Sequence, residues 1–214
     1  GFLPRWPDLE ALAAAPEEGV VAGWSGLGYY RRARALQRAA RQVLDQHGGQ
    51  LPRTPGELLA LPGIGSYTAG AILSIAFDLP EPLIDGNVER VLARIFVCDE
   101  PRGSPALTRR LEALTRSLMP TIREGVVGPR EWNQGLMELG ATLCLPREPR
   151  CPVCPARAFC GAADQGRQAE LPVRGAAAPA GWNGTAAPSG HATARDDASN
   201  WSHCRAGYRQ WRLR

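Results

Sequence analysis

The sequence predicts an all-α protein, and three observations lead to this fold class. Between residue 8 and about residue 160, apolar residues recur at the spacing of a helix, and no segment alternates convincingly as a strand would. Glycine and proline pairs divide this region into short segments. Several segments begin with Ser or Thr, which cap helix N-termini. We therefore expect a series of short helices joined by tight turns.

The longest helix is expected from Tyr29 to His47, and Gly48 with Gly49 should end it. Its apolar residues fall on one helical stripe, which we expect to face the core. The stripe consists of Leu36, Ala39, Ala40, Val43 and Leu44.

The shorter helices follow, several with a start signal of their own. Thr54 and Glu57 have the spacing of a capping box, which opens a short helix. Ser66 follows a Pro-Gly turn and should cap a helix that runs to about Phe77. Further helices are expected at residues 87–97, 104–119 and 129–143.

The composition limits the classes of protein to which the chain can belong. The chain has 214 residues and a formal net charge of +4, a weak indication of an anionic partner. No apolar run reaches the ~18 residues of a membrane span, and no signal peptide is visible, so a reducing cytosolic compartment is expected. All 25 Lys and Arg residues are arginine. Arginine suits phosphate, although a GC-rich coding sequence would explain the same bias.

Four cysteines lie within one short segment, in the pattern C-x6-C-x2-C-x5-C. They are Cys144, Cys151, Cys154 and Cys160. Thiolates at this spacing can converge on one metal centre inside a wrapped loop, and the spacing favours an iron–sulfur cluster. Zinc is an alternative, although zinc sites usually show two C-x2-C pairs. Two disulfides are a further alternative, which would require a secreted protein.

The chain divides into three segments by composition and motif. Residues 1–120 are expected to form a helical lobe, and residues 121–174 a second lobe around the four cysteines. Residues 175–214 are rich in Gly, Ala, Pro, Ser and Asn without periodicity, so we expect a disordered or aberrant tail.

A Leu-Pro-Gly-Ile-Gly sequence joins two of the short helices and has the form of a helix-hairpin-helix motif. Its turn comprises Pro62, Gly63, Ile64 and Gly65. Glycine allows a tight turn that exposes backbone N–H groups beside the positive N-terminus of the next helix. Such a turn can bind a DNA phosphate without reading sequence, although an ordinary corner between helices has the same pattern.

Asp85 stands two residues before the start of the helix expected at residues 87–97. A carboxylate in this position is most often an N-cap. A carboxylate at a helix N-terminus can also stabilise a cationic transition state, such as the oxocarbenium-like one in which an N-glycosidic bond breaks. Both interpretations apply to Asp85.

Together these motifs resemble the MutY family, the A/G-specific adenine glycosylases among the helix-hairpin-helix DNA glycosylases. The resemblance rests on Gly26–Tyr30, Leu61–Ile72, Ile84–Val88 and the four cysteines, and it extends over almost all of residues 1–174. It implies the helix-hairpin-helix glycosylase fold, with a helical barrel lobe and a [4Fe–4S] lobe. It also implies removal of adenine opposite 8-oxoguanine or guanine in double-stranded DNA, by a monomeric bacterial enzyme of the cytoplasm and nucleoid.

The resemblance assigns roles near the sugar to Asp85, Asn87 and Tyr67. Asp85 would be the catalytic carboxylate, assisted by Asn87 and Tyr67. In bifunctional endonuclease III, a nucleophilic lysine occupies the position of Tyr67. This chain contains no lysine, so it cannot form the usual Schiff base, and a monofunctional glycosylase is expected.

The resemblance also implies contacts with DNA outside the sugar site. Tyr29 would insert into the duplex where the base is flipped out, and Gln134 would meet the edge of the adenine. Arg147 and Arg150 would contact phosphates, although a solvated surface is the alternative for both.

Two family features have no counterpart in these residues: an N-terminal segment with a catalytic glutamate, and a Nudix-like C-terminal domain. We therefore expect an incomplete family member with weak activity. Two other functions remain open. One is an endonuclease III-like pyrimidine glycosylase and lyase, and the other is a DNA-binding remnant without catalysis.

Overall fold

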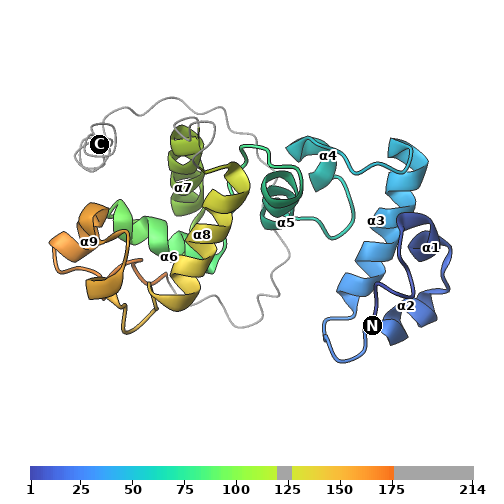
Figure 1. Ribbon diagram of the computed structural model, residues 1–214, viewed down its shortest axis with the longest axis horizontal. Coiled ribbons are helices and arrows are strands. Elements are labelled where there is room, and N and C mark those ends of the chain that lie inside the picture. Colours follow the sequence, from blue (N-terminus) through green and yellow to red (C-terminus); the bar gives the residue numbers. More distant parts are fainter. Residues whose placement is uncertain (120–126, 176–214) are drawn as a thin grey trace. The chain divides into compact units, whose positions relative to one another are not determined.

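The computed structural model describes residues 1–119 and 127–175. Every regular element within these ranges is helical, and none is a strand, which confirms the predicted all-α class (Figure 1). None of the helices in the described ranges is long and apolar enough to cross a membrane. The tail predicted from residue 175 lies outside these ranges except for Gly175.

The chain forms two compact units. The first comprises residues 1–83 together with the start of the last long helix, and the second begins at Ile84 and includes that helix from Gln134 onward with the cysteine segment. This division differs from the boundary after residue 120 drawn from the sequence. The reason is that the helix following Asp85 packs against the helix that follows Cys160, 66 or more residues further along the chain. The sequence-based lobes remain a prediction.

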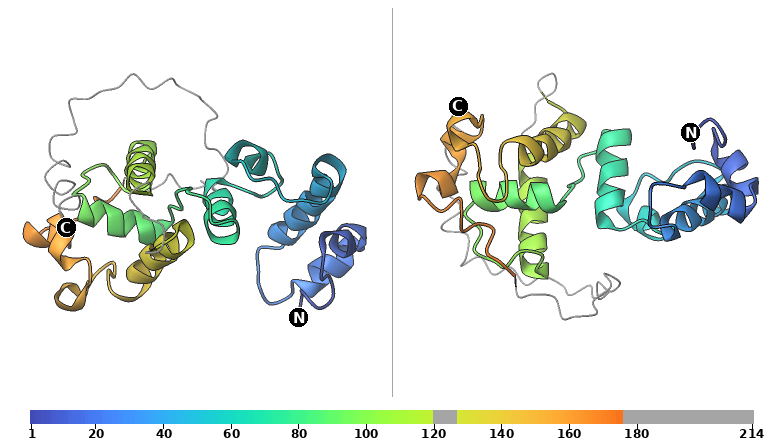
Figure 2. Two further views of the ribbon diagram at one scale, coloured as in Figure 1. Left: turned by 45° about the horizontal axis from the view of Figure 1, so that its top comes forward. Right: turned by 90° about the horizontal axis from the view of Figure 1, so that it is seen from below.

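Residues 1–83 of the first unit contain five α-helices and one turn of π-helix. They are α1 (Leu9–Ala14), α2 (Glu17–Gly23), α3 (Arg31–His47), α4 (Pro55–Leu59), α5 (Ser66–Ala71) and the π-helix η1 (Ile72–Ala76). Figures 1 and 2 show α1 and α2 lying along α3. Buried Val20, Ala33 and Ala40 fill this contact, beside the aromatic rings of Phe2 and Trp6.

Helix α3 begins two residues later than predicted, and two positions of its predicted apolar stripe are not buried. Ala39, Ala40 and Val43 are buried as expected, but Leu44 is half-buried and Leu36 is 40% exposed. Gln37 is buried in the neighbouring position, and its Nε2 donates to the carbonyls of Leu12 at 3.1 Å and Ala15 at 2.7 Å. These carbonyls end α1 and have no partner within the helix, so an amide satisfies them where a leucine could not.

The second unit contains α6 (Gly86–Ile95), α7 (Pro105–Leu118), most of α8 (Pro129–Thr142) and α9 (Gly161–Asp164). Ser104 caps α7 as predicted, since its side chain accepts from the Leu107 amide at 3.2 Å. Figures 1 and 2 show α9 beside α6. Gly161 permits this contact, because a Cβ there would lie 2.6 Å from the Val97 side chain.

Helices α6 and α8 approach closely at another glycine. A Cβ on Gly140 would lie 2.6 Å from the Asn87 Cβ and 3.0 Å from the Asn87 carbonyl oxygen. Gly140 is buried, whereas Gly135 on the same helix is exposed and has open space around it. The absence of a side chain at residue 140 is therefore required for this packing.

We expect Gly140→Ala to destabilise the second unit by about 1–3 kcal/mol, because a methyl group must push α6 away from α8. Gly135→Ala should stabilise the protein by up to about 1 kcal/mol, since alanine is the better helix former. Urea unfolding followed by circular dichroism measures both. Equal midpoints for the two variants would contradict the close contact.

Candidate active site and cysteine loop

Asp85 is the N-cap of α6, as the capping interpretation expected. Its Oδ1 accepts the backbone amides of Asn87 at 2.9 Å and Val88 at 2.7 Å. Its Oδ2 accepts the Asn87 side-chain amide at 3.3 Å. One carboxylate oxygen is thus fixed by the helix, while the other has a single side-chain donor among the described residues. A carboxylate held in this way keeps one orientation at the positive end of a helix.

Asn87 is held at both ends of its amide group. Its Nδ2 donates to Asp85, and its Oδ1 accepts from Arg90 Nη2 at 2.9 Å. Only one orientation of the amide satisfies both neighbours. The Asp85–Asn87 pair therefore depends on the position of Arg90.

Arg90 is 5% exposed and satisfies backbone carbonyls from three segments of the second unit. Its Nε donates to Cys144 O at 2.7 Å, Nη1 to Gly86 O at 3.2 Å and Nη2 to Gly140 O at 2.7 Å. Burial lowers the pKa of this guanidinium from its usual value, and the nearby Cys144 partly offsets the effect. A guanidinium still remains charged at neutral pH. Arg90 therefore links the start of α6 to the end of α8 and to the first cysteine.

The four cysteines lie along one loop between α8 and α9. This cysteine loop, residues 144–160, contains two single turns of 3-10 helix, Cys151–Val153 and Arg157–Phe159. None of the four cysteines is in a disulfide, which counts against the disulfide alternative. Among residues 1–119 and 127–175, no three metal-binding side chains are grouped as tightly as one metal ion requires.

The thiols nevertheless lie close enough to influence one another. Burial raises the pKa of Cys160, and the charges of Cys144, Cys151 and Cys154 raise it further. Burial also raises the pKa of Cys154, with contributions from Cys144 and Cys151. Without a metal these two thiols therefore favour their neutral forms, and metal ligation would require the thiolate forms.

The helix-hairpin-helix turn joins α4 to α5 in the first unit. Thr54 begins this motif as predicted, and its hydroxyl accepts the Glu57 amide at 3.4 Å. Gly63 has a left-handed φ of 78°, and a Cβ there would lie 2.6 Å from the Ala35 Cβ on α3. Gly65 is the N-cap of α5, in place of the predicted Ser66. Leu61 is buried, whereas Gly63, Gly65 and Ser66 are exposed.

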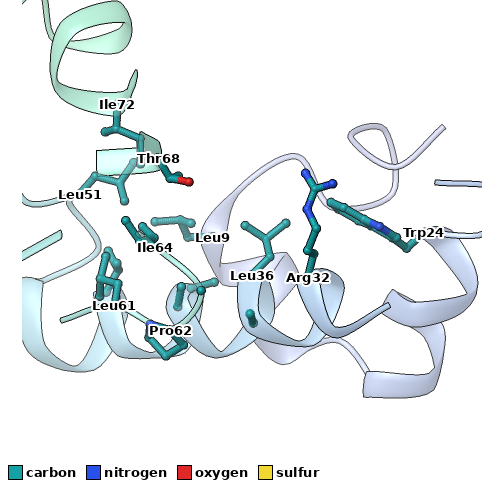
Figure 3. Close-up of a pocket in the computed structure, with 15 residues that line it drawn as sticks. Leu9, Trp24, Arg32, Leu36, Leu51, Leu61, Pro62, Ile64, Thr68 and Ile72 are labelled. Atoms are coloured by element: carbon teal, nitrogen blue, oxygen red, sulfur yellow. The ribbon is translucent and has the colours of Figure 1, made fainter. Parts of the chain in front are cut away.

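A pocket of about 290 Å³ lies beside this turn (Figure 3). Apolar residues of α3 and of the turn line it, and Leu36 is among them, which accounts for the exposure of that leucine. At one end, Arg32 lies 5.7 Å from the ring centre of Trp24. Beside the pocket, Leu61 and Ile64 pack against Ala39 and Val43 of α3, and this contact holds the turn in place.

Tyr29 occupies a tight loop before α3. It is 79% exposed and has a left-handed φ of 50°, which is uncommon for a residue with a side chain. Trp24 Nε1 donates to the carbonyl of Gly28 at 3.1 Å and holds the loop. The exposed ring is compatible with the predicted insertion into DNA.

The remaining predicted site residues are all at the surface. Tyr67 is 44% exposed on α5 in the first unit. Gln134 on α8 and the loop residues Arg147 and Arg150 are exposed in the second unit. The structure thus brings Asp85 and Asn87 together directly, and the functions of all these residues remain predictions.

Sequence reasoning missed Arg90 and Arg94, the two buried arginines of α6. Arg94 is 2% exposed, and its Nη1 donates to the sulfur of Cys144 at 3.3 Å. A signal was present, because the two arginines are four residues apart and flank the apolar run Val91, Leu92 and Ala93. Charged residues in such a helix are normally assigned to its solvated face.

Comparison with known proteins identifies the protein family to which this site belongs. Residues 1–117 match the family described as HhH-GPD superfamily base excision DNA repair protein. The chain belongs to this superfamily.

Individual proteins in this superfamily are similar to the chain in sequence and in fold. The chain is 43% identical over 176 residues to the human protein named adenine DNA glycosylase, covering 82% of this chain and 31% of that protein. Among solved structures, it resembles a thermostable thymine-DNA glycosylase with a TM-score of 0.63 and an endonuclease III trapped covalently on DNA with 0.60. Both are 27% identical and share 77% of this chain and 73% of theirs. The chain spans less than half the length of the human relative.

Proposed function

We propose that this chain is the catalytic part of an adenine DNA glycosylase, which removes adenine mispaired with 8-oxoguanine or guanine during base excision repair. The observation that carries the proposal is Asp85, fixed at the N-terminus of α6 and joined to Asn87. Similarity to an adenine DNA glycosylase supports the choice of base.

In the proposed reaction, the bond between the sugar C1′ and adenine N9 breaks, and positive charge develops on the sugar. The carboxylate of Asp85 stabilises this charge, and its fixed orientation means that little reorganisation is needed. The bonding electron pair leaves with adenine, water adds its hydroxyl group to C1′, and the proton that this water loses neutralises the departed adenine. Asn87 donates a hydrogen bond to Asp85, and Arg90 donates one to Asn87. Asn87 and Arg90 therefore act as positioning residues.

The proposed enzyme is monofunctional. A lyase of the endonuclease III type needs an amine nucleophile, and the chain contains no lysine. Tyr67, on α5, occupies the position at which endonuclease III has its nucleophilic lysine according to the resemblance. The similarity in fold to endonuclease III therefore does not extend to the residue that would form a Schiff base.

The proposed partner is double-stranded DNA containing an A:8-oxoguanine or A:G mismatch. The exposed glycines of the hairpin turn would contact a phosphate through their amides. Tyr29 would fill the space left by the flipped adenine, and Gln134 would hydrogen-bond to that base. Arg147 and Arg150 would contact further phosphates, which makes the affinity salt-dependent.

The proposed cofactor is a [4Fe–4S] cluster held by Cys144, Cys151, Cys154 and Cys160. Two observations support the fit: the four thiols are outside disulfides, and two buried guanidinium groups lie beside the first of them. The single C-x2-C pair favours a cluster over zinc, whose sites usually show two such pairs. The bound cluster would order the loop and take no part in breaking the glycosidic bond.

Metal analysis tests the cofactor directly. Protein purified without oxygen should contain about four irons per chain and absorb visible light, as four-cysteine clusters do. One zinc per chain without iron would contradict the proposal.

We expect Asp85→Asn to reduce adenine excision by about 10²–10³-fold, the usual effect of removing one group that stabilises transition-state charge. Asparagine is an equally good N-cap, so the helix should remain stable. Single-turnover cleavage of an A:8-oxoguanine duplex measures the loss, and exposed Asp45→Asn on α3 is the matched control.

A duplex containing thymine glycol, tested with and without alkali, separates the alternatives. Cleavage of that duplex without alkali would indicate a pyrimidine glycosylase with lyase activity. DNA binding without release of any base would indicate a non-catalytic protein. Either result contradicts the proposed function.

A further inference from the structure

Arg94 is the more deeply buried of the two arginines on α6. Its guanidinium donates to three backbone carbonyls: Nε to Leu171 at 2.8 Å, Nη1 to Leu145 at 2.8 Å and Nη2 to Pro146 at 3.2 Å. Nη1 also donates to the sulfur of Cys144. The side chain therefore has polar partners on every nitrogen.

These partners satisfy the hydrogen bonds of Arg94 but not its charge. Other arginines in the described ranges have carboxylates, such as Arg110 with Glu100 at 2.6 Å and Arg157 with Asp164 at 2.6 Å. No carboxylate lies within ion-pair distance of Arg94 in this part of the chain. A buried cation without a countercharge is expensive. Among the groups that Arg94 contacts, the sulfur of Cys144 is the one that can carry a negative charge.

Arg94 also reaches the other end of the cysteine loop. Its backbone carbonyl oxygen lies 3.7 Å from the sulfur of Cys160. The residue thus contacts both the first and the last of the four predicted ligands. Arg90, by contrast, bonds to the carbonyl oxygen of Cys144 and to no sulfur among the described residues.

We propose that Arg94 is the counter-cation of the cysteine centre and that its charge sets the reduction potential and the retention of the cluster bound there. The inference rests on the proposed cofactor and does not depend on glycosylase activity. Hydrogen bonds to cluster sulfurs and nearby charge are established determinants of potential. A cation beside Cys144 stabilises the reduced, more negative cluster and so raises the potential. Arg94 is a positioning and tuning residue, not a catalytic one.

Three variants of the full chain test the proposal: Arg94→Gln, which removes the charge, Arg94→Lys, which keeps it, and the control Arg157→Gln. Arg157 lies in the same loop but is exposed, and it pairs with Asp164. Each protein is purified without oxygen. Iron per chain, the midpoint potential of the cluster and the rate of cluster loss to an iron chelator are then measured, with circular dichroism as the check on folding.

We expect Arg94→Gln to shift the midpoint potential to a more negative value and to accelerate cluster loss by about 10-fold or more, as changes in partners of metal ligands do. Arg94→Lys should restore most of the potential, and Arg157→Gln should match the wild type.

An Arg94→Gln protein that binds the cluster and keeps the wild-type potential would overturn the proposal. If Arg94→Gln binds no cluster, the iron content of Arg94→Lys provides the test. A folded Arg94→Lys protein that also lacks iron would show that the charge of residue 94 does not determine cluster retention. A wild-type chain without iron would contradict the proposed cofactor, whereas a tuned cluster in a chain that releases no adenine would contradict the proposed activity alone.

Discussion

The organisation of the second unit depends on the burial of Arg90 among backbone carbonyls. Helix α6 begins directly after its N-cap Asp85, and α8 ends before Cys144, where the last carbonyls of a helix have no partner within it. Arg90 donates to Gly86, Gly140 and Cys144, so one side chain joins both helices to the cysteine loop. Replacing it with an apolar residue would leave three carbonyls and the Asn87 amide without this donor, and unpaired buried polar groups are costly.

The contacts around Arg90 require close helix packing at two glycines, and a second buried arginine lies beside the same cysteine. Gly140 lets α8 approach Asn87, and Gly161 lets α9 approach the end of α6. The cysteine loop therefore packs against α6, which carries two buried arginines. Arg90 holds the backbone at Cys144, while Arg94 holds its sulfur. The geometry that orients Asp85 and the geometry that surrounds the cysteines therefore share one helix.

Local features of this fold could be predicted from the sequence, and long-range ones could not. The caps at Thr54, Asp85 and Ser104 depend on residues two or three positions away, so sequence spacing was sufficient. Gln37 and Arg90 are buried because carbonyls 22 to 54 residues away in the chain accept their hydrogens. Sequence periodicity carries no information about such partners, and it assigns long polar side chains to the surface. The same limit applies to the two units, which contacts between distant segments define.

The claim that Arg90 joins the start of α6 to the cysteine loop is tested most directly by amide hydrogen exchange in Arg90→Met. Exposed Arg109→Met on α7 is the control, and the amides of α3 in the first unit are the internal reference. We expect faster exchange at the Val88 amide, which donates to Asp85, and at the Cys144 amide, which donates to the Leu139 carbonyl. Unchanged protection at both amides, with α3 also unchanged, would contradict it.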